Sequence, residues 1–204
     1  QHLDRLAGEC VRFERAYSVA PLTLPAHASM LTGLYPPRHG VHDNGVAVLA
    51  DSYETLADLA ADQGVSTGAV VASSVLDRAF GLAQGFAHWQ QPQAERELSA
   101  REVFQAGARW LSDRDRARPW FLWLHVYDAH VPYAPPAAAL RQARGDPYLG
   151  EIAAVDAALG EFLEPLRHDG TLDEALLLVV GDHGEALGEH GEPTHGALLY
   201  EATM

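Results

Sequence analysis

Gly68-Ala69-Val70-Val71-Ala72-Ser73 is a continuous run of small, mostly apolar residues. Such a run is typical of a strand that is buried on both faces of a sheet. Two further apolar runs, at residues 120–127 and 175–180, have the same character. Helical patterns at residues 98–112 and 146–167 separate the three runs. This alternation predicts an α/β fold whose mostly parallel sheet is sandwiched by helices.

The N-terminal part of the chain adds shorter elements to this pattern. Apolar spacing predicts helices at residues 1–8, 26–33 and 54–63. Pro25 suits the first turn of the second of these helices, and Gly64 would end the third. A short strand is expected at residues 11–17.

Composition limits the classes of function. The 204 residues, of which 48% are hydrophobic, are enough for the core of one domain. The formal net charge of −14 argues against a nucleic-acid scaffold, because the phosphate backbone would be repelled. No apolar run approaches the roughly 20 residues of a membrane span. The single cysteine, Cys10, permits no internal disulfide, so the redox compartment stays open.

Both ends of the sequence have the character of an interrupted chain. The first residues form a helical pattern without a start methionine or a helix cap. The last residues stop at Met204, inside an apolar helical pattern. We therefore expect residues 1–204 to be an internal fragment, a single partial domain. Its oligomeric state cannot be inferred from the sequence.

Polar side chains follow two of the predicted strands where each strand ends. Asp128 and His130 come after residues 120–127, and Asp182 and His183 come after residues 175–180. Ligands of an open α/β sheet bind beyond the carboxyl ends of its strands, so these side chains are expected to share one site. His195 lies in the loop that follows the second pair.

Two aspartates and three histidines are a plausible ligand set for a divalent metal ion. Nitrogen and oxygen donors suit zinc, while manganese or calcium is less favoured as histidines accumulate. Each pair alone also has a simpler interpretation. Asp182 would then cap a helix beside an incidental histidine, and Asp128 would form a turn before the proline-rich loop at residues 132–136.

Thr23 is the candidate nucleophile. It lies near the start of the predicted second helix, whose N-terminal amides favour an anion. A threonine hydroxyl is a weak nucleophile unless a metal or a base removes its proton. Asn44 has an amide that can stabilise a developing negative oxygen. The alternatives are an N-terminal cap for Thr23 and a turn before Gly45 for Asn44.

The ordered series of motifs resembles the sulfatase-like branch of the alkaline-phosphatase superfamily. The motifs extend over essentially the whole chain: Thr23-x-Pro25-x-His27, Thr32-Gly33-Leu34-Tyr35-Pro36, His39-Gly40, Asp43-Asn44, Asp128-x-His130-x-Pro132-Tyr133, Gly181-Asp182-His183-Gly184-Glu185, Gly188-Glu189-His190-Gly191 and His195-Gly196. The resemblance implies an alkaline-phosphatase-like fold and hydrolysis of a small anionic ester.

One departure from the sulfatase pattern bears on the chemistry. Sulfatases that use formylglycine generate it from Cys or Ser in a Cys/Ser-x-Pro-x-Arg motif, whereas this sequence has Thr23 and His27 at those two places. Threonine cannot become formylglycine. The motif instead resembles nucleotide pyrophosphatase/phosphodiesterases, in which the threonine attacks and an asparagine spaced like Asn44 contacts a phosphoryl oxygen. Phosphodiesters or phosphonate esters are therefore the expected substrates, and a sulfatase without formylglycine and a non-catalytic binding module are the alternatives.

The resemblance also implies the metal ligands. Asp182 and His183 match ligands of the ion that activates Thr23, and Asp128 and His195 match ligands of a second ion. Whether one or two ions bind stays open, because the histidine expected four residues after Asp128 is Pro132. His130 is then either a ligand or a contact to the substrate, and it is a candidate proton donor.

Family members also carry a first strand with a metal-binding Asp, which would precede Gln1. We expect the fragment to lack this strand and also the C-terminal part of the fold. We therefore expect the fragment to be inactive alone. Relatives are commonly periplasmic, secreted or membrane-anchored. The compartment of this protein cannot be inferred from its sequence.

Overall fold

The computed structural model describes residues 1–93 and 96–204. Its strands are β1 (Ser66–Val71), β2 (His88–Gln90) and β3 (Trp120–His125). Its α-helices are α1 (His2–Glu9), α2 (Thr23–Thr32), α3 (Pro36–His39), α4 (Leu56–Asp62), α5 (Ala100–Asp113), α6 (Ala137–Gln142) and α7 (Pro147–His168). Short 3-10 helices lie at η1 (Ser74–Leu76), η2 (Arg78–Phe80), η3 (Thr171–Glu174) and η4 (Glu189–Gly191).

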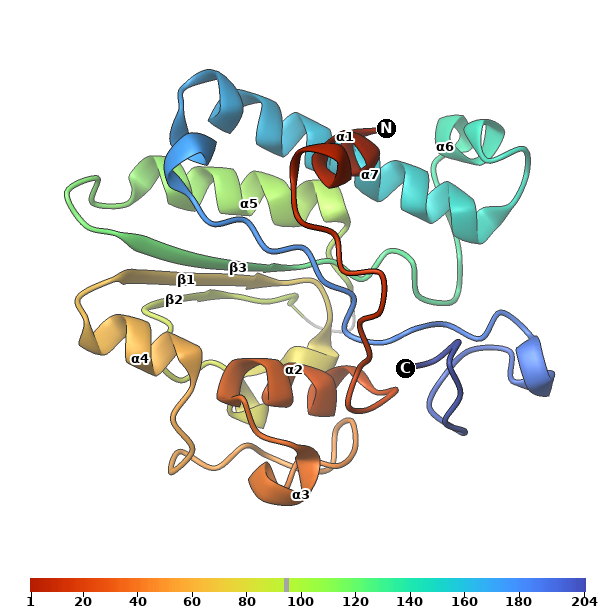
Figure 1. Cartoon of the computed structure of the whole chain (residues 1–204), viewed down its shortest axis with the longest axis horizontal. Helices are drawn as coiled ribbons and strands as arrows, with labels where there is room; N and C mark the ends of the chain where they lie inside the picture. Colours follow the sequence, from red (N-terminus) through yellow and green to blue (C-terminus); the bar gives the residue numbers. More distant parts are fainter. Residues whose placement is uncertain (94–95) are drawn as a thin grey trace.

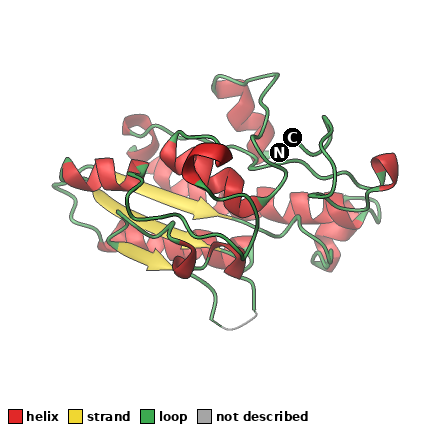
Figure 2. Cartoon of the chain, turned by 90° about the horizontal axis from the view of Figure 1, so that it is seen from below, coloured by secondary structure: helices red, strands yellow, loops and turns green. Residues whose placement is uncertain are grey.

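The three strands form one parallel sheet in the order β2-β1-β3. Gly68 of the central strand pairs with His88 on one side and with Leu122 on the other. Helices α5, α7 and α1 cover one face of the sheet, and α2 and α4 cover the other (Figure 1). The predicted α/β sandwich is therefore confirmed. The three strand arrows in Figure 2 point the same way, so their carboxyl ends share one edge.

Local sequence explains where the main helices begin. Ser99 and Glu102 form a capping box at α5, and Thr55 and Asp58 form another at α4. Asp146 caps α7 and is followed by a proline at the first position. Helix α2 begins three residues before the predicted helix at residues 26–33.

Two predicted strands are absent from the described residues. Residues 11–17 and 175–180 form no strand and pair with no described strand. Leu177 packs against the cluster between α5 and α7, but its neighbour Leu176 is 87% exposed. An apolar run needs a hydrogen-bonded neighbour to become a strand, and these two runs have none here. The predictions of these strands are wrong for this structure.

No described helix has both the length and the apolar character needed to cross a membrane. The last helical prediction, just before Met204, is also not met, because residues 197–204 are turns and irregular chain. The C-terminal part of the chain from residue 176 therefore contains a single short 3-10 helix, η4.

Candidate active site

Helix α2 places Thr23 at its first residue. Leu22, and not Thr23, occupies the N-cap position, which counts against the cap interpretation of Thr23. Thr23 is 1% exposed, and its Oγ1 lies 3.3 Å from Nε2 of His183, which is 160 residues away in sequence. The fold therefore brings the candidate nucleophile against the candidate metal motif.

Asn44 lies at the same helix end. Its Oδ1 accepts a hydrogen bond of 2.9 Å from the backbone N–H of Leu24, the residue after Thr23. Because the carbonyl oxygen of the amide is used in this way, the NH₂ group is the part of Asn44 left to donate. The orientation fits the predicted contact with a negatively charged oxygen.

The orientation of His183 is determined by its neighbours. Its Nδ1 lies 2.8 Å from the carbonyl oxygen of Gly184. A carbonyl can only accept, so Nδ1 carries the hydrogen and Nε2 holds a lone pair, which accepts from the hydroxyl of Thr23. Gly184 is required at its position, because a Cβ there would lie 2.0 Å from the carbonyl oxygen of Ala202.

His195 and His130 extend the site beyond His183. The ring centroids of His183 and His195 are 4.2 Å apart, and those of His195 and His130 are 5.2 Å apart. Nδ1 of His195 lies 3.3 Å from Oε2 of Glu185. Burial and the neighbouring His183 lower the pKa of His195, although Glu185 opposes this. The imidazoles of His183, His195 and His130 therefore follow one another in space, and the first of them contacts Thr23.

His130 is held by two contacts. Its Nδ1 donates to the carbonyl oxygen of Val131 at 2.7 Å, which leaves Nε2 with a lone pair. Its ring stacks on Tyr127, with centroids 4.3 Å apart and planes 17° from parallel. Burial raises the pKa of Tyr127 to about 12, so the phenol stays neutral. The predicted proton donor thus has a defined orientation.

Asp128 is engaged elsewhere. Both of its carboxylate oxygens accept from the backbone N–H of Ala100, at 3.0 and 2.9 Å, at the start of α5. Burial raises the pKa of Asp128 despite these contacts. This geometry is typical of a structural carboxylate at a helix start. The prediction that Asp128 binds a metal ion stays a prediction.

Two histidines that the sequence analysis assigned no role lie beside Asp182. Donor atoms of His27, His125 and Asp182 all lie within 4.8 Å of one another, and theirs is the one such group found among the described residues. Nδ1 of His27 donates to the carbonyl oxygen of Thr23 at 2.8 Å, which leaves its Nε2 with a lone pair. Nδ1 of His125 lies 3.3 Å from the backbone N of Ala72.

Asp182 and His27 of this group suit a metal ion, whereas Nδ1 of His125 accepts from the backbone N–H of Ala72. Burial lowers the pKa of His27 and holds that of His125 well below its ordinary value. Metal ligation requires neutral imidazoles, and zinc favours two nitrogens with a carboxylate oxygen. The sequence contained a signal that could have identified His27 and His125 as members of the site. His27 is four residues after Thr23 on one helix, and His125 ends a strand at the edge where ligands bind.

Known proteins share both sequence and fold with this chain. The model of the sulfatase family matches residues 1–202. An N-acetylgalactosamine-6-O-sulfatase from Bacteroides thetaiotaomicron is 35% identical over 75 residues, which are 34% of this chain and 14% of that protein.

Solved structures extend the likeness to the whole chain. The phosphonate monoester hydrolase of Agrobacterium radiobacter has a TM-score of 0.80 at 20% identity, over 99% of this chain and 61% of that one. An alkaline phosphatase superfamily protein from Vibrio parahaemolyticus has a TM-score of 0.75 at 21% identity, over 98% of this chain and 51% of that one. The fold is that of the alkaline phosphatase superfamily, and by the family match over residues 1–202 the chain belongs to the sulfatase family.

Proposed function

We propose that this chain carries the nucleophile of a metal-dependent hydrolase that cleaves phosphate or sulfate esters. Phosphodiesters or phosphonate esters are the preferred substrates in this proposal. The observation that carries the proposal is the 3.3 Å contact from the hydroxyl of Thr23 to Nε2 of His183 in a buried site. The family match and the fold shared with a phosphonate monoester hydrolase support the reaction class.

Thr23 attacks the phosphorus in this proposal. Its hydroxyl proton passes to water, because the one lone pair of His183, on Nε2, serves as a metal ligand in this proposal. The Oγ1–P bond forms, and the bond from phosphorus to the leaving oxygen breaks. The NH₂ group of Asn44 and the first amides of α2 donate to the oxygen on which charge develops. Water then cleaves the Thr23 ester and restores the hydroxyl.

The leaving oxygen takes a proton from Nε2 of His130 or His195 in the imidazolium form, in which both ring nitrogens carry a hydrogen. Both rings belong to the series of imidazoles that begins beside Thr23, and the Nδ1 of each is occupied by a neighbouring oxygen. Their Nε2 atoms are therefore the positions that exchange protons with a substrate.

The metal ligands in this proposal are Asp182, His183 and Thr23, together with His27. Nδ1 of His125 accepts from the backbone N–H of Ala72, so its neutral ring carries a hydrogen on Nε2 and is a donor beside the ion rather than a ligand. A divalent ion held by these ligands would favour the deprotonated hydroxyl and would offset the charge of the ester. Zinc is the favoured ion because histidine nitrogens are among the ligands, and manganese or calcium are the alternatives. Whether a second ion uses Asp128 and His195 belongs to the same proposal.

Assays of the full-length protein test the proposal. Thr23→Ala should lower kcat about a thousandfold or more, whereas Thr23→Ser, which keeps a hydroxyl, should retain part of the activity. Bis(p-nitrophenyl) phosphate, a p-nitrophenyl phosphonate ester and p-nitrophenyl sulfate should be compared with each variant. Turnover of Thr23→Ala within tenfold of the parent would exclude Thr23 as the nucleophile.

Sulfate-ester hydrolysis is the second candidate, because the family model and the N-acetylgalactosamine-6-O-sulfatase favour it. A preference for p-nitrophenyl sulfate by orders of magnitude would select it. If the intact protein bound no ion after loading with zinc or manganese and turned over none of the three esters, the non-catalytic binding module would replace both. Export from the cytoplasm stays a prediction from the family resemblance.

A further inference from the structure

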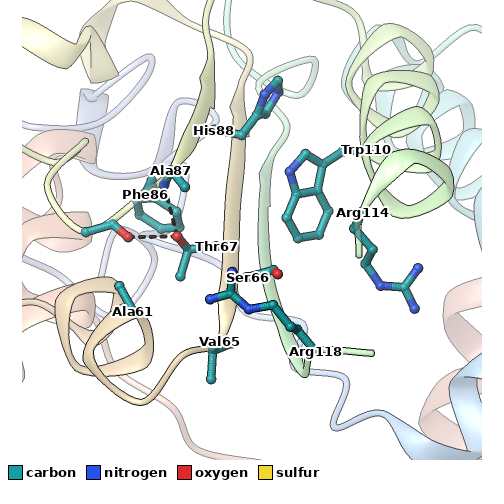
Figure 3. A pocket seen from close by; sticks show the side chains of 11 residues that line it. Ala61, Val65, Ser66, Thr67, Phe86, Ala87, His88, Trp110, Arg114 and Arg118 are labelled. Carbon is teal, nitrogen blue, oxygen red and sulfur yellow. Dashed lines mark hydrogen bonds between the residues drawn. The ribbon is translucent and has the colours of Figure 1, made fainter. Parts of the chain in front are cut away.

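A second cavity lies at the opposite end of the sheet from Thr23 and His183. It has a volume of about 540 Å³ and opens where β1 begins, at Ser66 and Thr67 (Figure 3). The loop that enters β2, the last turns of α5 and Arg118 complete its walls. The residues of the candidate active site follow the carboxyl ends of the strands, whereas this cavity lies at their amino ends.

One wall of the cavity is an aromatic plane. The indole of Trp110 lies directly against Gly68, where a Cβ would be 2.5 Å from Cε2 of Trp110. Glycine at this place in β1 is therefore what allows the ring to lie flat on the strand. On the other side, Oγ1 of Thr67 donates to the carbonyl oxygen of Gly85 at 2.8 Å and accepts from the backbone N–H of Ala87 at 2.9 Å (Figure 3). The side chains of Trp110 and Thr67 are thus held in defined positions on the two sides of β1.

The cavity is positively charged although the chain has a net charge of −14. Arg118 and Arg114 carry this charge, and none of the described lining residues is acidic. The guanidinium of Arg114 lies 5.4 Å over the ring of Trp120 and points away from β1 (Figure 3). Arg118 is therefore the charged group that faces the start of the strand.

Arg118 is held by one hydrogen bond, and the described residues use only part of the hydrogen-bonding capacity of its guanidinium. Its Nε donates to the carbonyl oxygen of Gly64 at 2.8 Å, which holds the planar group in place. Within residues 1–93 and 96–204, its two terminal amino groups, Nε1 of Trp110 and the hydroxyl of Ser66 make no hydrogen bond to the protein. These donors line one cavity and can reach an acceptor that comes from outside the chain.

We propose that this cavity binds a small organic anion with a flat apolar body. The ring of the ligand stacks on Trp110, and its carboxylate, sulfonate or similar oxyanion accepts from Arg118 and Ser66. A metal cation does not fit, because no acidic group is among the described residues that line the walls. The inference is independent of the proposed hydrolysis, since the two sites share no residue.

Titration of the full-length protein with 2-naphthalenesulfonate tests the site. In a ¹⁵N-labelled sample, the indole N–H signal of Trp110, assigned with Trp110→Phe, should shift and saturate, while the signals of Trp89, Trp120 and Trp123 shift less. Inorganic sulfate and 2-naphthalenemethanol, which carry only the charge or only the ring, should each bind at least about tenfold more weakly.

Matched variants distinguish binding at a specific site from nonspecific electrostatic attraction of the anion. Arg118→Gln should weaken binding of 2-naphthalenesulfonate about tenfold, the effect of losing one charge-assisted hydrogen-bond partner. Arg116→Gln removes the same charge two residues away, outside the lining, and should leave affinity unchanged. Equal losses in both variants, or a Trp110 signal that does not saturate, would overturn the proposal. Because Arg118 is exposed, both variants should keep the parent's circular dichroism spectrum.

Discussion

The candidate active site has two halves that differ in how they are supported. Thr23 and His27 belong to α2, whose residues from Thr23 to Ser29 are all buried. Asp182, His183 and His195 belong to residues 176–204, where Leu176, Leu178 and Val180 are 87%, 77% and 66% exposed. The nucleophile is thus fixed by a packed helix, whereas the metal motif is carried by irregular chain.

The difference shows where the organisation of this site is strong and where it is weak. Helix α2 packs into the main core through Leu24, Ala28 and Leu31. The metal motif is held by local backbone contacts, such as the hydrogen bond from the N–H of Gly184 to the carbonyl oxygen of Thr203. A ligand shared by both halves, such as a metal ion, would stabilise the weaker half most.

Hydrogen exchange should show the largest contrast between the halves. Amides of residues 176–204 are expected to exchange about a thousandfold faster than those of β1, because opening of irregular chain costs far less free energy than opening of the core. Mass spectrometry or NMR of the metal-free chain measures this. Similar protection in both regions would show that the comparison is wrong.

Leucine truncation should repeat the contrast in stability. Leu24→Ala empties a fully buried site on α2 and should cost about 2–5 kcal/mol of unfolding free energy. Leu178→Ala removes the same atoms from an exposed site and should change it by less than about 0.5 kcal/mol. Urea titrations of the two variants give the comparison, and a substantial loss in Leu178→Ala would reveal packing that the structure does not show.

Asn44→Ala probes the helix half during catalysis. It removes the acceptor for the N–H of Leu24 and the donor for the developing charge, so kcat should fall about 100- to 1000-fold. Val46→Ala, two residues away and 80% exposed, is the matched control and should change kcat little. The measurement is steady-state kinetics of the full-length protein, and an unchanged kcat in Asn44→Ala would remove Asn44 from the mechanism.

Acid should destabilise the metal-free protein through the buried histidines. Burial lowers the pKa of His27 and His125, so below about pH 6.5 the unfolded state binds more protons than the native state. The contribution of these two histidines to the free energy of unfolding is therefore fully present above that pH. It is lost as the pH falls, by up to about 1.4 kcal/mol per pH unit for each group.

Urea unfolding in EDTA at pH 7.5 and 5.5 measures this loss. His125→Gln should reduce the difference between the two pH values, and His168→Gln, which changes an exposed histidine, should not. An unaltered pH dependence in His125→Gln would mean that other groups cause the acid sensitivity.

Apolar runs identified two of the three strands, missed the short strand β2, and misled where a run has no neighbour. β3 lies inside its predicted run, and β1 starts two residues before its run and overlaps it from Gly68 to Val71. Residues 175–180 have the same composition, but pairing depends on another segment, which local sequence does not encode. The motifs predicted that Thr23, Asn44 and His183 share a site, and the structure brings the three close together at the start of α2, while their roles stay predictions.

The roles of Asp128 and the buried histidines could not be read from spacing. Asp128 stands two residues before His130, yet its oxygens contact the start of α5. His125 joins Asp182 only through the tertiary fold. In both cases the direction of a side chain, rather than its place in sequence, decides the contact.

The backbone contacts of His27, His130 and His183 have a consequence for how such a site can change over evolution. In each ring Nδ1 donates to a main-chain carbonyl, of Thr23, Val131 and Gly184 respectively. Every amino acid supplies that acceptor, so substitutions at Thr23 and Val131 keep it, and the third position is already restricted to glycine by its backbone contacts. Ligand preference can therefore drift through neighbouring side chains while the tautomer of each imidazole is inherited unchanged with the fold.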